Sequence, residues 1–332
     1  MVDPILPSEY QSMLKMGMDV DWAKTLPGRI QAQKAHDDNI SVPLKFKNRG
    51  INHVRIRVTD DVRNTTVNAK TGRTLLQEIT VLVDDCLKAD LLPIIAYQAA
   101  DFKKNPTDDA VLQGVVDWWT AVANNFKGYS YKLAYNFIIE TTEELKKNND
   151  RLNLCYQKVS DAIRAIDPCR IGIVAPNKIS DPYELDRLVV PTPTQYRMVE
   201  WHFYAAGPQR DNPAKQWTTG TDAEKKLIAD KIAAARNWSL RQQIPTWVGA
   251  WMANNYNEDQ EGSPDASVLF DGAPGGGDYT PEQQIAFATF MSSQLQQAGI
   301  PYAVNSDTKF YDRTSNAWYE SMATVLDAMI WK

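Results

Sequence analysis

Short apolar segments alternate with longer amphipathic segments along most of the chain. A run of about four to eight apolar residues, bounded by polar or turn-forming residues, is typical of a buried strand. The chain contains eight runs of this kind, and we expect strands at Met16–Val20, His53–Val58, Leu92–Tyr97, Leu133–Glu140, Ile171–Val174, Met198–Tyr204, Thr246–Trp251 and Pro301–Asn305.

Between these runs, apolar residues recur at three- and four-residue spacing, which predicts amphipathic helices. The clearest helix is expected at Arg151–Ile166. A second begins with Thr280 as N-cap and Gln283 completing a capping box, and it ends at Gly299, which suits a left-handed C-terminal cap. Near the end of the chain we expect a further helix with an apolar stripe of Trp318, Met322, Val325, Leu326 and Met329.

Strand and helix alternate eight times over the 332 residues. This pattern predicts an α/β fold, a (β/α)8 TIM barrel, which typically needs about 250 residues plus insertions. A doubly wound open sheet is the alternative, but no Gly-x-Gly-x-x-Gly follows the first strand, which weakens its dinucleotide-binding version. Because no linker-like change of composition is visible, we expect one catalytic domain over residues 1–332. The longest irregular loop is expected at Asn254–Asp278, after the seventh strand.

Charge and hydropathy limit the classes of partner. The net charge is −5, which gives no reason to expect nucleic acid or an anionic membrane as a partner. No apolar run approaches the roughly 20 residues of a membrane-spanning helix, so we expect a soluble protein, and we expect it to be a monomer. The start of the chain, Met1–Ile5, lacks a basic region followed by an apolar one. We expect a secreted or periplasmic location, with a signal peptide already removed.

The cysteines give no sign of metal binding. Cys86, Cys155 and Cys169 lack the spacing of a metal site, and no other ligand cluster of suitable spacing appears, so we expect no metal or organic cofactor. Cys86 and Cys155 fall on apolar helical faces, where we expect them to be small buried hydrophobic residues.

In a (β/α)8 barrel, functional side chains lie at the carboxyl ends of the strands. Here these ends carry carboxylates, amides and aromatic rings, which suit a sugar site because sugars offer hydroxyls for hydrogen bonds and apolar faces for contact with rings. Trp251, at the end of the seventh strand, could lean into the cleft. The substrate-binding residues that we expect are Asp21, Trp22, Tyr97, Gln98, Trp251 and Asn305.

Four of these strands resemble glycoside hydrolase family 5, the retaining β-glycanases that include many cellulases and mannanases. Asn52–Arg57 is similar to the second strand of the family, whose arginine would be Arg55. Leu133–Thr141 is similar to the fourth strand, with Glu140 in the place of the acid/base glutamate. The resemblance implies that Arg55 hydrogen-bonds the nucleophile and that Glu140 protonates the leaving oxygen.

The sixth and seventh strands carry the rest of the resemblance. Glu200–Tyr204 is similar to the family's sixth strand through His202 and Tyr204, which the resemblance implies orient the nucleophile and the sugar. In the seventh strand of the family a glycine is followed directly by the nucleophilic glutamate, and that position here holds Ala250. The resemblance therefore implies a catalytic set of Glu140, Ala250, Arg55, His202 and Tyr204.

The sequence also departs from the family pattern at several points. Ile139 and Thr141 stand where the family has asparagine and proline around the acid/base. The usual histidine of the third strand is replaced around Tyr97 and Gln98, and the usual tryptophan of the eighth strand is missing, with Asn305 near its place. The chain is therefore expected to be a divergent relative.

An alanine at position 250 removes half of a two-carboxylate mechanism, because it offers no nucleophile and no charge to the transition state. An engineered Glu→Ala change, made to trap a substrate complex, is the favoured explanation. The alternative is a natural enzyme that lost or relocated its nucleophile, with Glu200, Glu258 and Asp307 as candidates for its replacement.

We therefore expect a glycoside hydrolase that acts on a β-linked polysaccharide or oligosaccharide by a retaining two-glutamate mechanism, in a form inactivated at the nucleophile. Two other classes remain open. One is a catalytically silent carbohydrate-binding barrel, and the other is a barrel enzyme of unrelated chemistry.

Overall fold

Eight parallel strands close into a barrel in the computed structural model, which describes residues 3–204, 216–252 and 280–332. Each strand pairs with the next in chain order, and β1 pairs with β8 to close the ring. The predicted (β/α)8 fold and its eight strands are confirmed. The strands are β1 (Met16–Val20), β2 (His53–Val58), β3 (Leu92–Tyr97), β4 (Ala134–Asn136), β5 (Gly172–Val174), β6 (Arg197–Tyr204), β7 (Thr246–Met252) and β8 (Tyr302–Val304).

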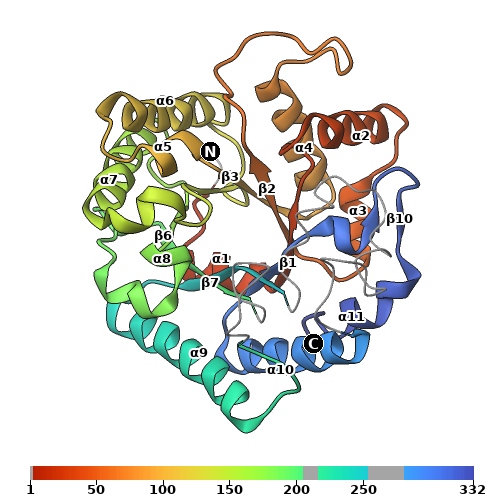
Figure 1. The fold of residues 1–332 in the computed structure, drawn as a ribbon. Coiled ribbons are helices and arrows are strands. Elements are labelled where there is room, and N and C mark those ends of the chain that lie inside the picture. The colour runs from red at the N-terminus through yellow and green to blue at the C-terminus, as the bar shows by residue number, and fades with distance from the viewer. Residues whose placement is uncertain (1–2, 205–215, 253–279) are drawn as a thin grey trace.

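Helices surround the barrel as an outer ring (Figure 1). The α-helices are α1 (Pro7–Leu14), α2 (Leu26–Asp37), α3 (Val42–Asn48), α4 (Leu75–Lys88), α5 (Ala100–Lys104), α6 (Asp109–Asn125), α7 (Asn149–Ile166), α8 (Asn177–Ser180), α9 (Asp222–Gln242), α10 (Pro281–Ala298) and α11 (Ala323–Asp327). The 3₁₀ turns are η1 (Glu143–Lys147), η2 (Pro182–Arg187), η5 (Asp307–Lys309) and η6 (Glu320–Met322). Among the helices of the described ranges, none has both the length and the hydrophobicity needed to cross a bilayer. The expected loop Asn254–Asp278 lies outside the described residues.

Local sequence signals explain where α10 begins and ends. The Thr280 hydroxyl accepts a hydrogen bond from the backbone N–H of Gln283, and the Gln283 side chain accepts one from the backbone N–H of Thr280. Gly299 follows the helix with a φ of 69°, a left-handed conformation that glycine adopts without a Cβ clash. The predicted capping box and C-terminal cap are confirmed. The predicted burial of Cys86 and Cys155 is also confirmed.

The helix expected near the end of the chain is wrong in its first part. Trp318 lies instead in β10 (Ala317–Trp318), which pairs antiparallel with β9 (Tyr311–Asp312), and Met322 lies in η6. The rings of Tyr311 and Trp318 both pack against Phe46, with centroids 5.1 and 4.8 Å from its ring. The contacts of these rings with α3 therefore outweigh the helical spacing of the sequence in this segment. The α-helix begins only at Ala323.

The amino-terminal end of the barrel is closed by α1 (Pro7–Leu14). The Tyr10 hydroxyl donates to the backbone oxygen of Lys132, and the carbonyl oxygen of Leu14 accepts a hydrogen bond from Nδ1 of His53, at 2.8 Å. His53 is fully buried, and burial lowers its pKa to about 3, so its ring is neutral. Its free Nε2 accepts a hydrogen bond of 3.0 Å from the indole N–H of Trp247. These residues form the floor of the barrel.

The floor leaves no room for a side chain at Gly17. A Cβ added there would lie 2.3 Å from the His53 ring. We expect Gly17→Ala to lower the free energy of unfolding by about 1–3 kcal/mol, because overpacking forces the ring from its hydrogen bonds. The matched control is Gly114→Ala in α6, where nothing lies within 4 Å of the added Cβ and the change should stabilise by about 0.5–1 kcal/mol. Urea denaturation measures both, and equal effects would contradict the proposed clash.

Candidate functional site

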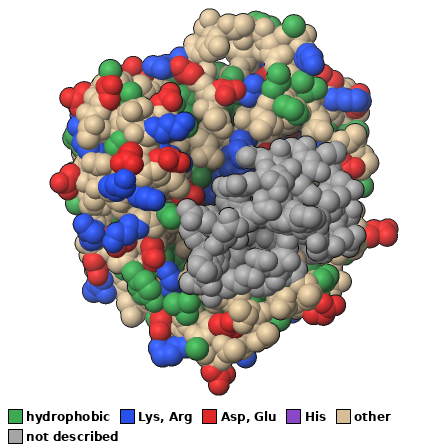
Figure 2. Space-filling view, in the orientation of Figure 1, with side chains coloured by type: hydrophobic (Ala, Val, Ile, Leu, Met, Phe, Trp, Pro, Cys, Tyr) green, Lys and Arg blue, Asp and Glu red, His purple; other side chains and the backbone are tan. Residues whose placement is uncertain are grey.

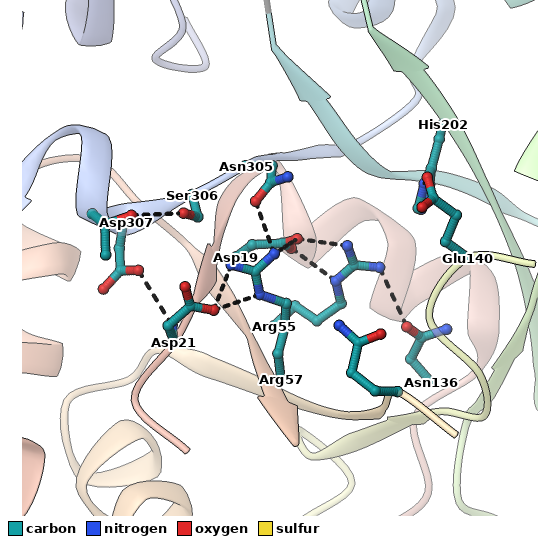
Figure 3. A network of polar contacts seen from close by, with 12 residues as sticks. Asp19, Asp21, Arg55, Arg57, Asn136, Glu140, His202, Asn305, Ser306 and Asp307 are labelled. Atoms are coloured by element: carbon teal, nitrogen blue, oxygen red, sulfur yellow. Dashed lines mark hydrogen bonds and ion pairs between the residues drawn. The ribbon is translucent and has the colours of Figure 1, made fainter. Parts of the chain in front are cut away.

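A buried arginine lies at the centre of the polar residues in the barrel mouth (Figure 3). Arg55 of β2 is 1% exposed and forms a two-point ion pair with Asp19 of β1, with Nε–Oδ1 at 2.8 Å and Nη2–Oδ2 at 2.6 Å. Its Nη1 lies 3.3 Å from Oδ1 of Asn136 and 3.3 Å from both carboxylate oxygens of Glu200. The guanidinium also lies 5.5 Å from the centroid of the Trp247 ring. Arg55 thus links β1, β2, β4, β6 and the barrel floor.

A histidine connects two carboxylates beside this arginine. His202 lies two residues after Glu200 on β6, so both side chains are on the same face of the strand. Its Nε2 is 2.9 Å from Oε1 of Glu200, and its Nδ1 is 3.0 Å from Oε1 of Glu140. The Glu200 side chain is 0% exposed, whereas that of Glu140 is 25% exposed. Glu140 is therefore the end of this chain of contacts that solvent or a ligand can reach.

The electrostatics of these contacts favour the charged forms of His202 and Glu140. Burial by itself would lower the pKa of His202, but its hydrogen bonds to Glu140 and Glu200 and their charges outweigh burial and raise the pKa to about 9. Burial would likewise raise the pKa of Glu140, but His202, Lys103 and Arg55 lower it below its ordinary value. Near neutral pH, His202 is an imidazolium that donates from both ring nitrogens, and Glu140 is a carboxylate.

Lys103 adds a cation from outside the barrel strands. It lies on α5, is 6% exposed, and donates from Nζ to Oε1 of Gln98 at 3.2 Å. Burial lowers its pKa to about 8, against the opposing influence of the Glu140 and Glu200 charges. Gln98, an expected substrate contact, therefore has its amide oxygen engaged by this lysine.

A second polar group lies on the β1–β8 side of the mouth (Figure 3). Arg57 donates from Nε to Oδ1 of Asp21 at 2.7 Å and from Nη1 to Oδ1 of Asn305 at 2.9 Å. Asn305 in turn donates from Nδ2 to the Tyr204 hydroxyl at 3.2 Å. Three expected site residues, Asp21, Asn305 and Tyr204, are thus brought together through Arg57.

Asp307 anchors this second group from beneath. It is 0% exposed and accepts two hydrogen bonds from Arg313, from Nε at 2.9 Å and from Nη2 at 2.7 Å. It also accepts from the indole N–H of Trp22 at 3.0 Å and from the backbone N–H of Asp21 at 3.2 Å. Asp307 therefore has a structural role, and it is too enclosed to replace a nucleophile. Glu258, another candidate replacement, lies outside the described residues.

The seventh strand brings Ala250 next to His202. The two residues are paired across β6 and β7, directly after an irregularity in the register of the two strands. At the preceding residue, Gly249, an added Cβ would lie 3.0 Å from Nη1 of Arg55 and 3.0 Å from the Glu200 carboxylate. Position 250, where the resemblance predicts the nucleophile, therefore adjoins the Arg55, Glu200 and His202 contacts.

The aromatic residues expected to contact sugar are mostly enclosed. Trp251 does not lean into the cleft: it is 0% exposed and packs against Phe287 of α10 and Tyr302, with centroids 5.6 and 5.7 Å away. The irregularity before it turns its ring toward the helix layer. Trp22 is 2% exposed, with its N–H bound to Asp307. Tyr97 is partly exposed, with one face stacked on Trp118 at 4.2 Å.

Several residues of the centre are absent from the predicted site, and Glu200 is predicted only as a candidate replacement for the nucleophile. Glu200 carried a usable signal, because it lies two residues before His202 and so shares its strand face. Asp19 had the same relation to Asp21. Asn136 and Lys103 had no such signal, since only the closed barrel brings β4 and α5 against Arg55 and Glu140. In the described part of the chain, no group of three or more histidine, cysteine, aspartate or glutamate side chains is arranged to hold a metal ion.

The centre can hold a ligand by hydrogen bonding and charge. Glu140 offers a partly exposed carboxylate, and the residues behind it fix its position and its ionisation. The same face in space-filling view is hollowed near its middle, with Lys or Arg side chains at the hollow (Figure 2). A polar, charge-lined hollow of this kind suits a ligand rich in hydroxyl groups.

The chain matches a family model described as "Cellulase (glycosyl hydrolase family 5)" over residues 21–271. It is similar in structure to ZgEngAGH5_4, with a TM-score of 0.76 at 18% identity, covering 99% of both chains. It is also similar to a protein described as "endoglucanase", with a TM-score of 0.72 at 18% identity, covering 96% of this chain and 99% of the other. Cel5A of Thermotoga maritima in complex with mannotriose gives a TM-score of 0.72 at 16% identity, covering 98% and 100%. No curated protein matches the chain in sequence.

The charged state of His202 predicts that stability depends on pH. Its pKa of about 9 lies above the ordinary value of 6.5, so its contribution is complete below pH 6.5 and is lost as the pH rises through 9. The full loss corresponds to about 3 kcal/mol. Lys103, with a pKa lowered to about 8, acts in the opposite direction as it loses its proton.

Comparison with a variant separates the two groups. We expect the difference in free energy of unfolding between the protein and His202→Gln to be largest near pH 6 and to narrow toward pH 9. Urea denaturation at half-unit pH steps measures this difference, in which the lysine contribution cancels. A difference that stays constant over this range would contradict a protonated His202.

Proposed function

Because the chain belongs to the cellulase family, glycosyl hydrolase family 5, we propose that its barrel mouth binds β-linked glycans with Glu140 in the acid/base position. Family membership supports a glycoside hydrolase domain directed at β-glycans. The similar structures include a hyperthermophilic endo-β-1,4-glucanase in complex with substrate and ZgEngAGH5_4 in complex with a cellotriose. A β-glucan or β-mannan chain is therefore the substrate class that we propose.

The single observation that carries the proposal is the placement of Glu140. It is a partly exposed carboxylate four residues beyond the end of β4, hydrogen-bonded to His202, and His202 is paired with Ala250 across β6 and β7. Its backbone has a φ of 50°, a left-handed conformation that costs energy in a residue with a side chain and is concentrated at functional sites. The strand β4 ends at Asn136, whereas the sequence predicts that it extends to Glu140. Glu140 therefore adopts its left-handed conformation outside the strand.

A retaining glycosidase needs a second carboxylate about 5–5.5 Å from the acid/base, as nucleophile. We propose that position 250 is the nucleophile site of the parent mechanism, and its alanine supplies no attacking oxygen. Loss of a nucleophile costs on the order of 10⁴–10⁶-fold in rate. In this form we propose that the chain binds glycans without measurable hydrolysis.

The charge state of Glu140 agrees with binding more than with turnover. In an intact pair, the charge of the nucleophile raises the pKa of the acid and keeps its proton in place. Here the surrounding cations lower the pKa of Glu140 instead, so it is ionised near neutral pH. An ionised carboxylate accepts hydrogen bonds from sugar hydroxyls, which supports a glycan-binding barrel as the second candidate function.

Binding and hydrolysis of soluble β-glucan, β-mannan and xylan test the proposal. We expect the chain to bind at least one of these glycans without measurable turnover, and Ala250→Glu to gain hydrolysis with retained anomeric configuration. Adding Glu140→Gln to Ala250→Glu should remove that gain by roughly 10²–10⁴-fold, the contribution typical of general acid–base catalysis. Calorimetry measures binding, and NMR of the released sugar measures the anomeric configuration.

Glu144→Gln in Ala250→Glu is the matched control, because Glu144 lies in η1, close to Glu140 in sequence, but its side chain is 58% exposed and pairs with Lys147. This control should leave both binding and hydrolysis unchanged. Turnover by the alanine form would place the nucleophile elsewhere. Binding without turnover in every variant would favour the silent binding barrel, and absence of binding would refute the proposed function.

A further inference from the structure

Glu200, one of the predicted candidates for a relocated nucleophile, is a buried carboxylate. Its side chain is fully buried inside the barrel, whereas that of Glu140 is partly exposed. An ionised carboxylate in such a place is stable only when cations and hydrogen-bond donors surround it. Glu200 has two such partners, the Nη1 of Arg55 and the Nε2 of His202.

Both partners of Glu200 are residues that the family resemblance assigns to the nucleophile. The resemblance implies that Arg55 hydrogen-bonds the nucleophile and that His202 helps to orient it. In the structure, Nη1 of Arg55 lies 3.3 Å from each oxygen of Glu200, and His202 lies 2.9 Å from one of them. The other two nitrogens of Arg55 are bound by Asp19. The contacts that a nucleophile would use are thus taken by Glu200.

The backbone of β7 leaves the space for this arrangement. Gly249 has no side chain, and a Cβ there would come within 3.0 Å of both the Glu200 carboxylate and Arg55. The Glu200 carboxylate therefore lies directly against the residue that precedes position 250. A carboxylate on residue 250 and the carboxylate of Glu200 would compete for the same two cations.

We propose that Glu200 is a positioning residue that stands in for the carboxylate missing at position 250, neutralising Arg55 and holding His202 against Glu140. The proposal rests on the proposed function, since it takes position 250 as the nucleophile site. With Glu200 present, a glutamate introduced at 250 adds one negative charge to a centre already balanced. When Glu200 is replaced by glutamine, a glutamate introduced at 250 can pair with Arg55 and His202 without a competing carboxylate.

Four proteins test this: the chain, Ala250→Glu, Glu200→Gln and the double variant. Titration of the His202 ring by NMR is the first measurement, since the chain has only three histidines. We expect Glu200→Gln to lower the His202 midpoint by about one pH unit or more, because a charge partner is removed. Adding Ala250→Glu to that variant should raise the midpoint again.

Hydrolysis of β-glucan is the second measurement. We expect the double variant to be at least about tenfold faster than Ala250→Glu alone, a difference of about 1.4 kcal/mol in the barrier. Glu78→Gln is the matched control, because Glu78 is also a buried carboxylate in an ion pair, with Arg29 at 3.0 Å, but on α4 outside the barrel. Combined with Ala250→Glu, it should give no gain in rate.

The outcomes separate this proposal from the proposed function. A His202 midpoint that is unchanged in Glu200→Gln, or one that Ala250→Glu does not restore, would overturn the role of Glu200. An Ala250→Glu variant as active as the double variant would also overturn it. Failure of all four proteins to bind any glycan would refute the proposed function, while the titration would still decide whether Glu200 holds His202.

Discussion

The need to neutralise Arg55 inside the barrel organises the rest of the site. A guanidinium remains charged in any protein, so its burial requires anionic partners in fixed positions. Asp19 supplies a two-point pair from β1, and Glu200 and Asn136 approach from β6 and β4. The same requirement brings Glu200 beneath His202, and His202 then holds the exposed Glu140. The position of Glu140 at the barrel mouth thus depends on Arg55, a cation that solvent does not reach.

The strand positions could be predicted because they depend on local patterns. Each of the eight strands is a short apolar run, and the caps of α10 are read directly from Thr280, Gln283 and Gly299. The last helix could not be predicted correctly, because Phe46, more than 250 positions earlier in the chain, supplies the rings of Tyr311 and Trp318 with their packing surface. Local spacing carries no information about such a distant contact.

The same division applies to the site. Glu140, His202 and Arg55 follow from strand ends and resemblance, and the structure brings them into one centre. The orientation of Trp251 did not follow, because an irregularity in the pairing of β6 and β7 reverses the simple alternation of faces. Glu200 could be placed on the face of His202 but not beside Arg55, because that contact depends on barrel closure.

A series of side-chain contacts connects the floor of the barrel with the polar residues of its mouth. The carbonyl of Leu14 holds His53, His53 accepts from Trp247, and the Trp247 ring lies under the Arg55 guanidinium. The short helix that closes the amino-terminal end is therefore in continuous contact with the cation that fixes the opposite end. A shift of that helix would reach Arg55 only through His53 and Trp247, the two side chains that lie between them.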